Sequence, residues 1–530
     1  MMSLAATLAA CGGESSPAPA PPPAPTPAPA AATATLAAPS DGQFAWRLAQ
    51  AASITLTDAG GHAVAASATT CAAHDATQVT VSADCSQVTA LRVGPLTIDV
   101  SGGGASASLV VHGVPQRHWA GMHGASRYTA LTVADDGSAT AWGDNDSHVL
   151  DAEAGSATET TVAVATPAMS VAGTPWAHVM QASLGEGSAL VLFNDGTAQG
   201  WGDDGSRQLG ADVTSAAPLG PVAVVDLTAH APLQHVVQIE SGDSNGVALI
   251  DDGSVLSWGS YAGNGGNGSF LLPVQTLSPD GVTPLGHVVA VSAGWNHAMA
   301  LTDDGRVVSW GFDPGPGTLG QGAAEPSVGR LPAYVVRADG TPLDGIVQVS
   351  AGYNFCLALA NDGTVWAWGS NAEGQLGGGT AGGSSAFAVQ VLAAGGGNLS
   401  RIAMVAAGGW HALALDLDGR VLAWGLNTDG QLGDGAGAPV TNETAVPRVV
   451  VAETGSIAGS TDIVSIAASY SDSYALGRDG RVLSWGRNFH GALGRSTTGP
   501  NDRTPTRVAT AASTLTLTSA AYPNLLRRAR

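Results

Sequence analysis

The sequence contains no lysine, because all 20 of its basic residues are arginines, and only 12% of its 530 residues are charged. The missing lysine excludes a nucleotide-binding P-loop and Schiff-base chemistry, since each needs a lysine amine. No stretch approaches the ~20 apolar residues of a membrane-spanning helix. Acidic residues give a net charge of −22, which disfavours nucleic acid as a partner. The basic run at residues 527–530 is interpreted as a solvated tail, within a C-terminal segment at 519–530.

Active-site signatures are also missing. There is no His-Glu-x-x-His zinc-protease motif and no Gly-x-Ser-x-Gly nucleophile elbow. Two Gly-x-Gly-x-x-Gly matches, at residues 263–268 and 315–320, are not followed by a predicted helix, which a dinucleotide site would need. The paired aspartates at 135–136, 251–252 and 303–304 lie in predicted turns, where aspartate bonds to the backbone. We therefore predict no catalytic residue, no metal site and no cofactor.

The first 11 residues resemble a bacterial lipoprotein signal, because Leu-Ala-Ala precedes Cys11 as in a lipobox. The resemblance implies that Cys11 is lipidated and becomes the first residue of an extracytoplasmic protein anchored in the cell envelope, at the outer membrane or cell surface. The segment departs from the pattern in lacking a basic start, so we expect the true start to lie upstream of Met1. The alternative is a disordered cytoplasmic tail in which the motif is accidental.

Residues 12–40 are rich in proline and alanine, which predicts an extended spacer. Residues 41–115 alternate in short strand-like runs between glycine-rich turns and predict a small β-sandwich-like domain. Cys71 and Cys85 lie 14 positions apart within it, and in an exported protein a disulfide is the simplest prediction. A zinc site with His62 and His74 is the alternative, although those residues lack ligand spacing.

A repeat dominates the remaining sequence. Asp-Gly, four residues and Trp-Gly recur seven times, with successive tryptophans 52 to 61 residues apart by subtraction. The turn glycines are Gly137, Gly196, Gly253, Gly305, Gly363, Gly419 and Gly480, and the tryptophans are Trp142, Trp201, Trp258, Trp310, Trp368, Trp424 and Trp485.

Each copy predicts a blade of four strands. Two apolar runs flank the Asp-Gly pair, which favours a two-residue type I′ hairpin. Another apolar run precedes the hairpin, and a run around a proline follows it. Seven such units predict an all-β fold, a seven-bladed β-propeller, with the repeat tryptophans buried between blades. An aromatic ligand cage built from those tryptophans is the alternative.

The repeat resembles that of the RCC1 (regulator of chromosome condensation) family, most fully around residues 351–377 and 407–433. The resemblance covers residues 116–518 and implies that family's propeller. The first and third copies depart from it at residues 148–150 and 263–268, so altered loops are expected there. We expect a strand within residues 504–518 to complete the ring with the first repeat.

One repeat position, seven residues before the turn aspartate, is commonly histidine in that family. It reads Thr129, Ser188, Asn245, His297, Phe355, His411 and Asp472. Only two of the seven are histidine, which favours a structural role, with side chains bonding to backbone near the channel. Cys356 follows Phe355 in an apolar run and is interpreted as a small buried hydrophobic residue without an activating neighbour.

These observations predict a non-enzymatic binding protein. We expect a monomer, held at the membrane by the lipid anchor alone, whose propeller loops bind a protein or glycan partner. The best-known family member implies a guanine-nucleotide exchange factor for a small GTPase as one alternative. A propeller hydrolase is another, and would gather residues with perturbed pKa values at one channel mouth.

Overall fold

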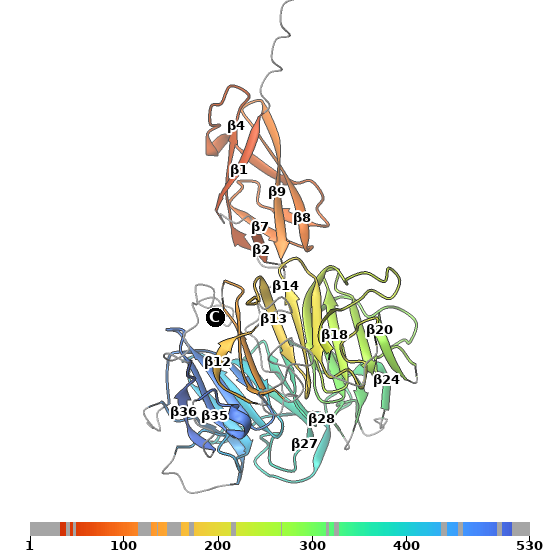
Figure 1. The fold of residues 1–530 in the computed structure, drawn as a ribbon, viewed down its shortest axis with the longest axis vertical. Coiled ribbons are helices and arrows are strands. Elements are labelled where there is room, and N and C mark those ends of the chain that lie inside the picture. The colour runs from red at the N-terminus through yellow and green to blue at the C-terminus, as the bar shows by residue number, and fades with distance from the viewer. Residues whose placement is uncertain are drawn as a thin grey trace, which may run out of the picture.

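The seven repeats fold into seven β-sheets arranged as the blades of a propeller, in the computed structural model of the chain (Figure 1). Six blades have four strands each, and three strands of the first blade are described. Two 3-10 turns, η1 (Ala66–Ala68) and η2 (Phe489–Gly491), are the helical elements within the described part of the chain. The structure describes residues 32–38, 43–45, 49–114, 129–134, 136–145, 161–168, 174–213, 219–266, 268–313, 317–322, 328–435, 442–453, 459–495 and 501–510.

Within each blade the strands follow one another in sequence order, so every connection is a simple hairpin or loop. The first strands of neighbouring blades lie against one another and line the central channel. These inner strands are β13 (Val179–Leu184), β17 (Val236–Ser241), β21 (Val288–Ala293), β25 (Ile346–Ala351), β29 (Ile402–Ala407) and β33 (Ile463–Ala468). The second strands are β10 (Thr129–Val133), β14 (Ser188–Phe193), β18 (Asn245–Ile250), β22 (His297–Thr302), β26 (Phe355–Ala360), β30 (His411–Asp416) and β34 (Asp472–Gly477).

The outer half of each blade completes the sheet. The third strands, which carry the repeat tryptophans, are β11 (Ala139–Asp144), β15 (Ala198–Gly202), β19 (Val255–Ser260), β23 (Val307–Phe312), β27 (Val365–Ser370), β31 (Val421–Leu426) and β35 (Val482–Gly486). The outermost strands are β12 (Thr161–Pro167), β16 (Leu219–Ala223), β20 (Ser269–Gln275), β24 (Val328–Tyr334), β28 (Ser384–Gln390), β32 (Glu443–Val449) and β36 (Asp502–Arg507).

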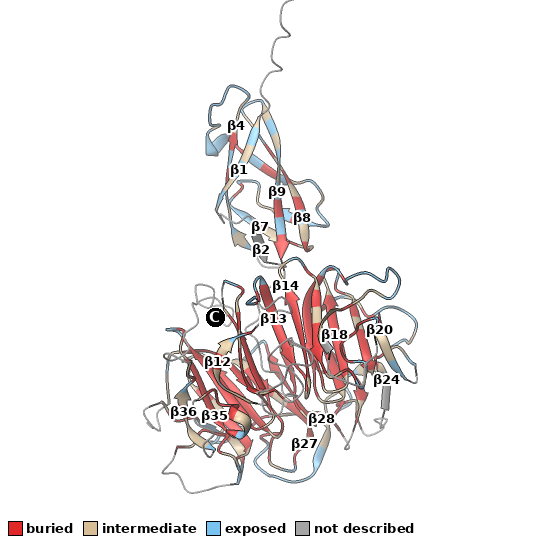
Figure 2. Ribbon diagram, viewed as in Figure 1, coloured by how far each residue is buried: buried red, intermediate tan, exposed pale blue. Residues whose placement is uncertain are grey.

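The repeat tryptophans are buried between blades, and Figure 2 shows how burial follows the propeller strands. Trp424 of blade 6 is fully buried and donates its Nε1 hydrogen to the carbonyl oxygen of Gln375 in blade 5, 2.9 Å away. A Cβ on Gly377, in the same loop as Gln375, would lie 3.0 Å from that Nε1. The glycine of this Leu-Gly pair therefore has a packing role, because a side chain there would collide with the indole of the next blade.

The hairpin turn differs from the predicted type I′ turn, which needs positive φ at both central residues. In blade 4 the Gly305 N–H donates to the Thr302 carbonyl oxygen at 2.9 Å, and Gly305 has a φ of 80°. Asp303 and Asp304 are absent from the residues with positive φ. The loop is therefore a type I turn followed by a left-handed glycine, the three-residue hairpin form. The Asp304 carboxylate accepts from the Arg306 backbone N–H at 3.3 Å, as expected for a turn aspartate.

The C-terminal residues reach the first repeat, as predicted. β36 pairs with β35 of its own blade, and directly after it the Ala509 carbonyl oxygen accepts from the Ala165 N–H of β12 at 2.8 Å, beside a parallel bridge between Ala165 and Thr510. Trp142 of blade 1 also donates to the carbonyl oxygen of Ala492 in blade 7 at 2.9 Å, and Gly494 packs on the same indole. The same tryptophan contact joins blades 5 and 6. Blade 1's predicted first strand falls in residues 115–128, outside the described residues.

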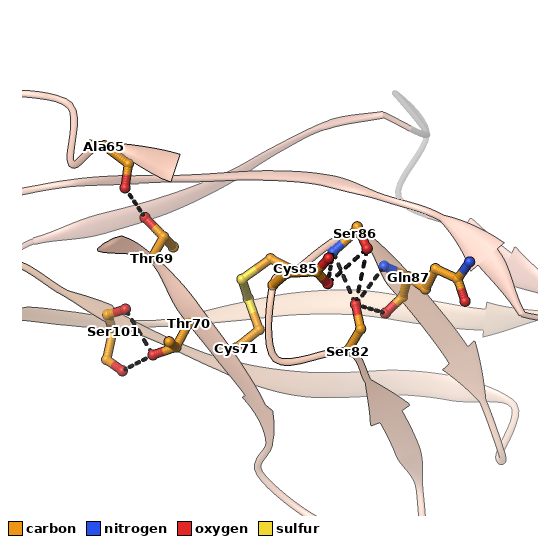
Figure 3. Close-up of a disulfide and its surroundings, with 10 residues drawn as sticks. Ala65, Thr69, Thr70, Cys71, Ser82, Cys85, Ser86, Gln87 and Ser101 are labelled. Atoms are coloured by element: carbon orange, nitrogen blue, oxygen red, sulfur yellow. Dashed lines mark hydrogen bonds between the residues drawn. A yellow bond between two sulfur atoms is a disulfide. The ribbon is translucent and has the colours of Figure 1, made fainter. Parts of the chain in front are cut away.

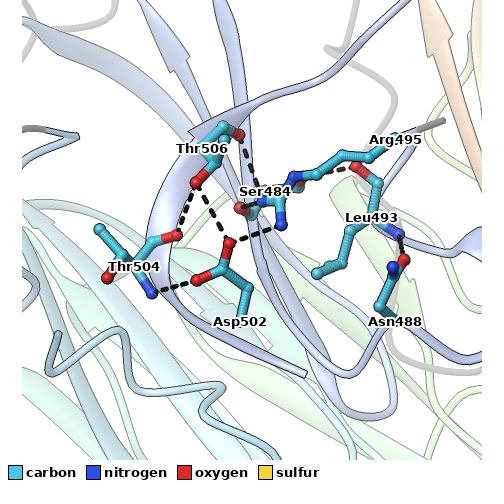
Figure 4. A network of polar contacts seen from close by, with 7 residues as sticks. All are labelled: Ser484, Asn488, Leu493, Arg495, Asp502, Thr504 and Thr506. Atoms are coloured by element: carbon cyan, nitrogen blue, oxygen red, sulfur yellow. Dashed lines mark hydrogen bonds and ion pairs between the residues drawn. The ribbon is translucent and has the colours of Figure 1, made fainter. Parts of the chain in front are cut away.

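A half-buried ion pair holds β36 in the last blade, as Figure 4 shows. Arg495 pairs with Asp502 at 2.7 Å and also donates to Ser484 of β35 at 3.3 Å. Burial lowers the pKa of Arg495, and the Asp502 carboxylate opposes that shift. Asp502 also accepts from the Thr504 backbone N–H at 2.9 Å. The outermost strand is thus fixed by side chains as well as by its backbone ladder.

The N-terminal domain is a small β-domain of three sheets around one apolar core. Its sheets have the orders β2-β9-β8-β5, β3-β7-β6 and β1-β4. The strands are β1 (Thr33–Ala38), β2 (Gln43–Ala45), β3 (Gln50–Ala51), β4 (Ser53–Thr57), β5 (Thr70–Ala73), β6 (Val79–Val81), β7 (Gln87–Ala90), β8 (Gly94–Gly102) and β9 (Ala105–Val114). Cys71 and Cys85 form a disulfide within this core, with Cα atoms 5.2 Å apart (Figure 3).

The domain begins earlier than position 41. β1 lies within the segment assigned to the spacer, yet it pairs with β4. Its residues alternate between exposed and half-buried, and Ala34 and Leu36 pack against the core. A period of two is enough to form an edge strand even in a sequence this poor in large apolar residues. Cys11, most of the spacer and the tail at 519–530 lie outside the described residues.

The small domain docks on the propeller through the loop between β7 and β8 and through the end of β9, where Val114 is buried with residues of blades 2 and 3. Arg92 pairs with Asp251 at 2.7 Å, and the Val93 backbone N–H donates to the other oxygen of that carboxylate at 2.7 Å. Val93 is buried in the core shared by blades 3 and 4. Asp251 directly follows β18, at the end of the blade that carries the Asp-Gly turns. We call this the turn face, and we call the opposite face, with the loops between first and second strands, the loop face.

Candidate binding face at the channel mouth

The predicted ring of seven residues occupies one place in every blade. Each is the first residue of its second strand, where the chain enters the sheet from the loop face. All seven are buried, with at most 5% of the side chain exposed. Ring residues contact the neighbouring blade: His411 Nε2 lies 2.9 Å from Ser473 Oγ, and Ser188 Oγ lies 3.3 Å from Ser241 Oγ. Thr129 Oγ1 makes the predicted kind of bond, donating to the Asp144 carbonyl oxygen at 2.9 Å, so the ring residues bond to side chains as well as to backbone.

Cys356 has a neighbour that sequence reasoning missed. His297 Nε2 lies 3.2 Å from its sulfur, although the two residues are 59 positions apart and belong to different blades. A cysteine beside a histidine is the beginning of a nucleophilic site. Both side chains are fully buried, however, and burial lowers the pKa of His297 to about 4. The pair is closed to a substrate and joins two blades.

We expect the two ring histidines to cost stability in mild acid. Burial lowers the pKa of His411 to about 3, as it lowers that of His297 to about 4. Unfolded histidine titrates near 6.5, so below that pH the unfolded chain binds protons that the folded chain refuses. The free energy of unfolding should therefore fall as the pH falls, by about 2 kcal/mol per histidine between pH 7.5 and 5.

Asparagine occupies the ring position in blade 3, so His297→Asn and His411→Asn are matched variants. Urea unfolding at pH 7.5 and pH 5 measures the free energy of unfolding at each pH. The difference between the two values should be about 2 kcal/mol smaller in each variant than in the wild type. Asp472 acts with the opposite sign, because burial raises its pKa and its contribution is lost as the pH rises, but it is common to all chains. Equal pH dependence in wild type and the double variant would contradict neutral buried histidines.

The channel wall is built from side chains that pair with the next blade. Gln238 of β17 donates to the Val291 carbonyl oxygen at 2.8 Å and accepts from the Val291 N–H at 3.0 Å. Gln348 of blade 5 makes the same pair of bonds with Val405 of blade 6. Ser350 Oγ accepts from the Ala407 N–H at 3.0 Å. These polar groups form hydrogen bonds between blades. Their presence in the channel wall is therefore not by itself evidence of a ligand-binding site.

Aromatic side chains gather where the channel opens on the loop face. Four of them, here called the mouth cluster, are Trp295, Tyr353, Trp410 and Tyr470, from the first loops of blades 4 to 7. Trp295 stacks on Tyr353 with ring centroids 4.2 Å apart and an angle of 13°. Trp410 lies edge-on to Tyr470 at 4.5 Å, and Tyr353 meets Tyr470, two blades away, at 5.6 Å. All four are half-buried, so the cluster is both packed and reachable from solvent.

An acidic residue extends the cluster into blade 3. Trp295 Nε1 donates to Asp243 Oδ2 at 2.9 Å, and the Asp243 backbone N–H donates to the Trp295 carbonyl oxygen at 3.0 Å. The position equivalent to Asp243 in blade 2 is Glu186, also half-buried. The mouth therefore combines an aromatic surface with carboxylates on one side.

The loop face also carries a cleft of about 470 Å³ where blades 6, 7 and 1 meet. Its lining residues are Thr161, Asp429, Arg487, Asn488, Phe489, His490 and Asn501. Phe489 is exposed, stacks on His490 with centroids 4.1 Å apart, and has the Arg487 guanidinium 4.9 Å from its ring. The negative charge of Asp429 adds to the effect of burial in raising the pKa of Asp472, which lies two residues after Tyr470.

Other candidate positions carry no site. Among the described residues no group of three or more His, Cys, Asp or Glu side chains could hold a metal ion, and no helix is long and apolar enough to cross a membrane. Gly263 and Gly320, from the two glycine-rich matches, pack on the indoles of Trp310 and Trp368. Gly315, Asp135 and residues 148–150 lie outside the described residues. Gly263 shows that the third copy, despite its altered loop, keeps the glycine contact to the next blade.

Comparison with known proteins agrees with this architecture. A family model described as an RCC1-like domain matches residues 264–522. The probable E3 ubiquitin-protein ligase HERC6 of Homo sapiens is 33% identical over 285 residues, covering 52% of this chain but only 26% of that protein. The regulator of chromosome condensation of Mus musculus is 28% identical over 330 residues, covering 60% of this chain and 74% of the relative.

Solved structures show the same fold. The structure of yeast RCC1 (Prp20) bound to Kap60 superposes with a TM-score of 0.57 and 20% sequence identity, covering 74% of this chain and 86% of that one. The seven blades, the buried repeat tryptophans and these matches lead to one assignment: the chain belongs to the RCC1 repeat family.

Proposed function

We propose that this protein is a non-enzymatic binding protein, tethered to the outside of a membrane through Cys11, whose loop face binds a partner. The observation that carries the proposal is the docking of the small domain. Arg92 and Val93 fix that domain on the turn face, and the predicted anchor and spacer precede it in the chain. The mouth cluster lies on the opposite face and is left open to a partner.

The chemistry of the propeller supports binding rather than catalysis. The paired cysteine and histidine are closed to solvent, and the channel wall uses its polar groups between blades. Tryptophan and tyrosine are enriched at the centres of protein interfaces, and four of them form the mouth cluster. Related propellers bind proteins, as the yeast structure with Kap60 illustrates. A monomer fits this arrangement, since the ring closes within one chain.

Fractionation of the native host tests the tether. Wild-type chain should be found with membranes and be removed by protease added to intact cells, whereas Cys11→Ala should leave the membrane fraction. Cys356→Ala, which removes the buried thiol, is the matched control and should stay membrane-bound. A wild-type chain that is cytoplasmic and indifferent to Cys11→Ala would overturn the proposal and favour a GTPase regulator instead.

A further inference from the structure

The mouth cluster offers acceptors to a ligand on its Trp295 side. The indole N–H of Trp295 is already used by Asp243 Oδ2, which also accepts from Ser244 Oγ at 3.3 Å. In the described part of the chain no group donates to the other carboxylate oxygen, Oδ1. What remains there is a carboxylate oxygen and the π-system of a half-buried indole. Both attract cations.

The geometry of the rings further limits the kind of ligand that can bind and where it can lie. Their planes meet at angles of 42°, 84° and 76° around Tyr353, Trp410 and Tyr470, so they do not form the flat strip on which a row of sugar rings would stack. Centroid distances of 4.2 to 5.6 Å mean that the rings touch, which leaves no space between them for an ammonium group. A ligand must therefore lie on the cluster, at its edge beside Asp243.

We propose that Trp295 and Asp243 bind an arginine or lysine side chain presented by a basic protein partner. The cation lies against the indole while its N–H groups donate to Asp243 Oδ1. A net charge of −22 on a chain without lysine would steer a basic partner toward the propeller. The inference rests on the proposed function, because it assumes that the loop face is the one presented.

The test uses the full chain with Cys11→Ala in every variant, so that no lipid is attached. Binding of a hexa-arginine peptide is measured by titration calorimetry, with hexa-citrulline as the uncharged isostere. Hexa-arginine should bind and hexa-citrulline should not. Asp243→Asn should weaken binding about tenfold, and Trp295→Ala about 30-fold, as expected of an interface hot spot.

Asp303→Asn is the matched control, since it removes one exposed carboxylate from the turn face and changes the net charge equally. It should change the affinity less than twofold. If Trp295→Ala unfolds, Trp295→Phe keeps a ring, removes the N–H and should weaken binding less than Asp243→Asn. If Asp243→Asn and Asp303→Asn weakened hexa-arginine binding equally, the proposed site would be wrong, and the peptide would be held by the net negative charge of the protein. Binding of a neutral oligosaccharide that Trp295→Ala abolishes would overturn it in favour of a glycan. Neither result bears on the proposed membrane anchor at Cys11, which the fractionation experiment tests separately.

Discussion

Trp424→Ala is expected to lower the free energy of unfolding by about 4 kcal/mol, the usual cost of deleting a buried aromatic side chain. Trp424 is fully buried among residues of blades 5 and 6, and its Nε1 hydrogen bond to Gln375 is also lost. Both effects act on one interface between blades. Urea unfolding followed by tryptophan fluorescence and by circular dichroism would measure the change.

Trp410→Ala is the matched control for that result. It removes the same side chain from the same blade, but from the half-buried mouth cluster rather than the core. We expect a loss of about 1 kcal/mol, because part of this indole is already in contact with water. If both variants were destabilised equally, the distinction between structural and binding tryptophans would be wrong.

Asp251→Asn is expected to loosen the small domain from the propeller by about 3 kcal/mol. The carboxylate is almost fully buried and accepts from both Arg92 and the Val93 N–H. Replacing Asp251 leaves the Arg92 guanidinium without its ionised partner, which costs free energy when the charge is buried. The cost is reduced here because Arg92 is partly exposed to water. Hydrogen exchange at the Val93 amide should accelerate about a hundredfold, since 1.4 kcal/mol is a factor of ten.

Asp252→Asn provides the comparison for the docking loop. Asp252 is the next residue, is half-exposed and lies 4.0 Å from the same guanidinium. Exchange at Val93 should be nearly unchanged in this variant. Unaltered exchange at Val93 in Asp251→Asn would mean that the apolar packing of Val93 and Val114 holds the domain in place.

The sequence predicted the blades because their determinants are local and repeated. The Asp-Gly and Trp-Gly pairs lie within one hairpin, so the turn, two strands and the buried face can be read together. The turn type was wrong because a glycine at positive φ is common to both turns. Type I′ also needs positive φ at the residue before the glycine, and Asp304 does not adopt it.

The mouth cluster could not be predicted in the same way. Trp295, Tyr353 and Tyr470 share one repeat position, but Trp410 lies one position later in its loop, so aligning the repeats collects three of the four residues and none of their contacts. Its contacts also join different blades, as does the pair of His297 and Cys356. Such contacts depend on the angle between neighbouring sheets, which no single repeat encodes. The docking of Arg92 on Asp251, 159 residues away, was missed for the same reason.

The seam between the first and last blades has a consequence for the order in which the protein is made. Trp142 meets its acceptor, Ala492, across 350 residues of chain. At about 5–20 residues per second, a ribosome needs roughly 20 to 70 seconds to produce that stretch. For all of that time blade 1 presents an indole to water with no partner to cover it. The face of blade 1 that carries Trp142 therefore stays uncovered until the last repeat is made, and a chain that lacks this repeat would leave that face exposed to solvent.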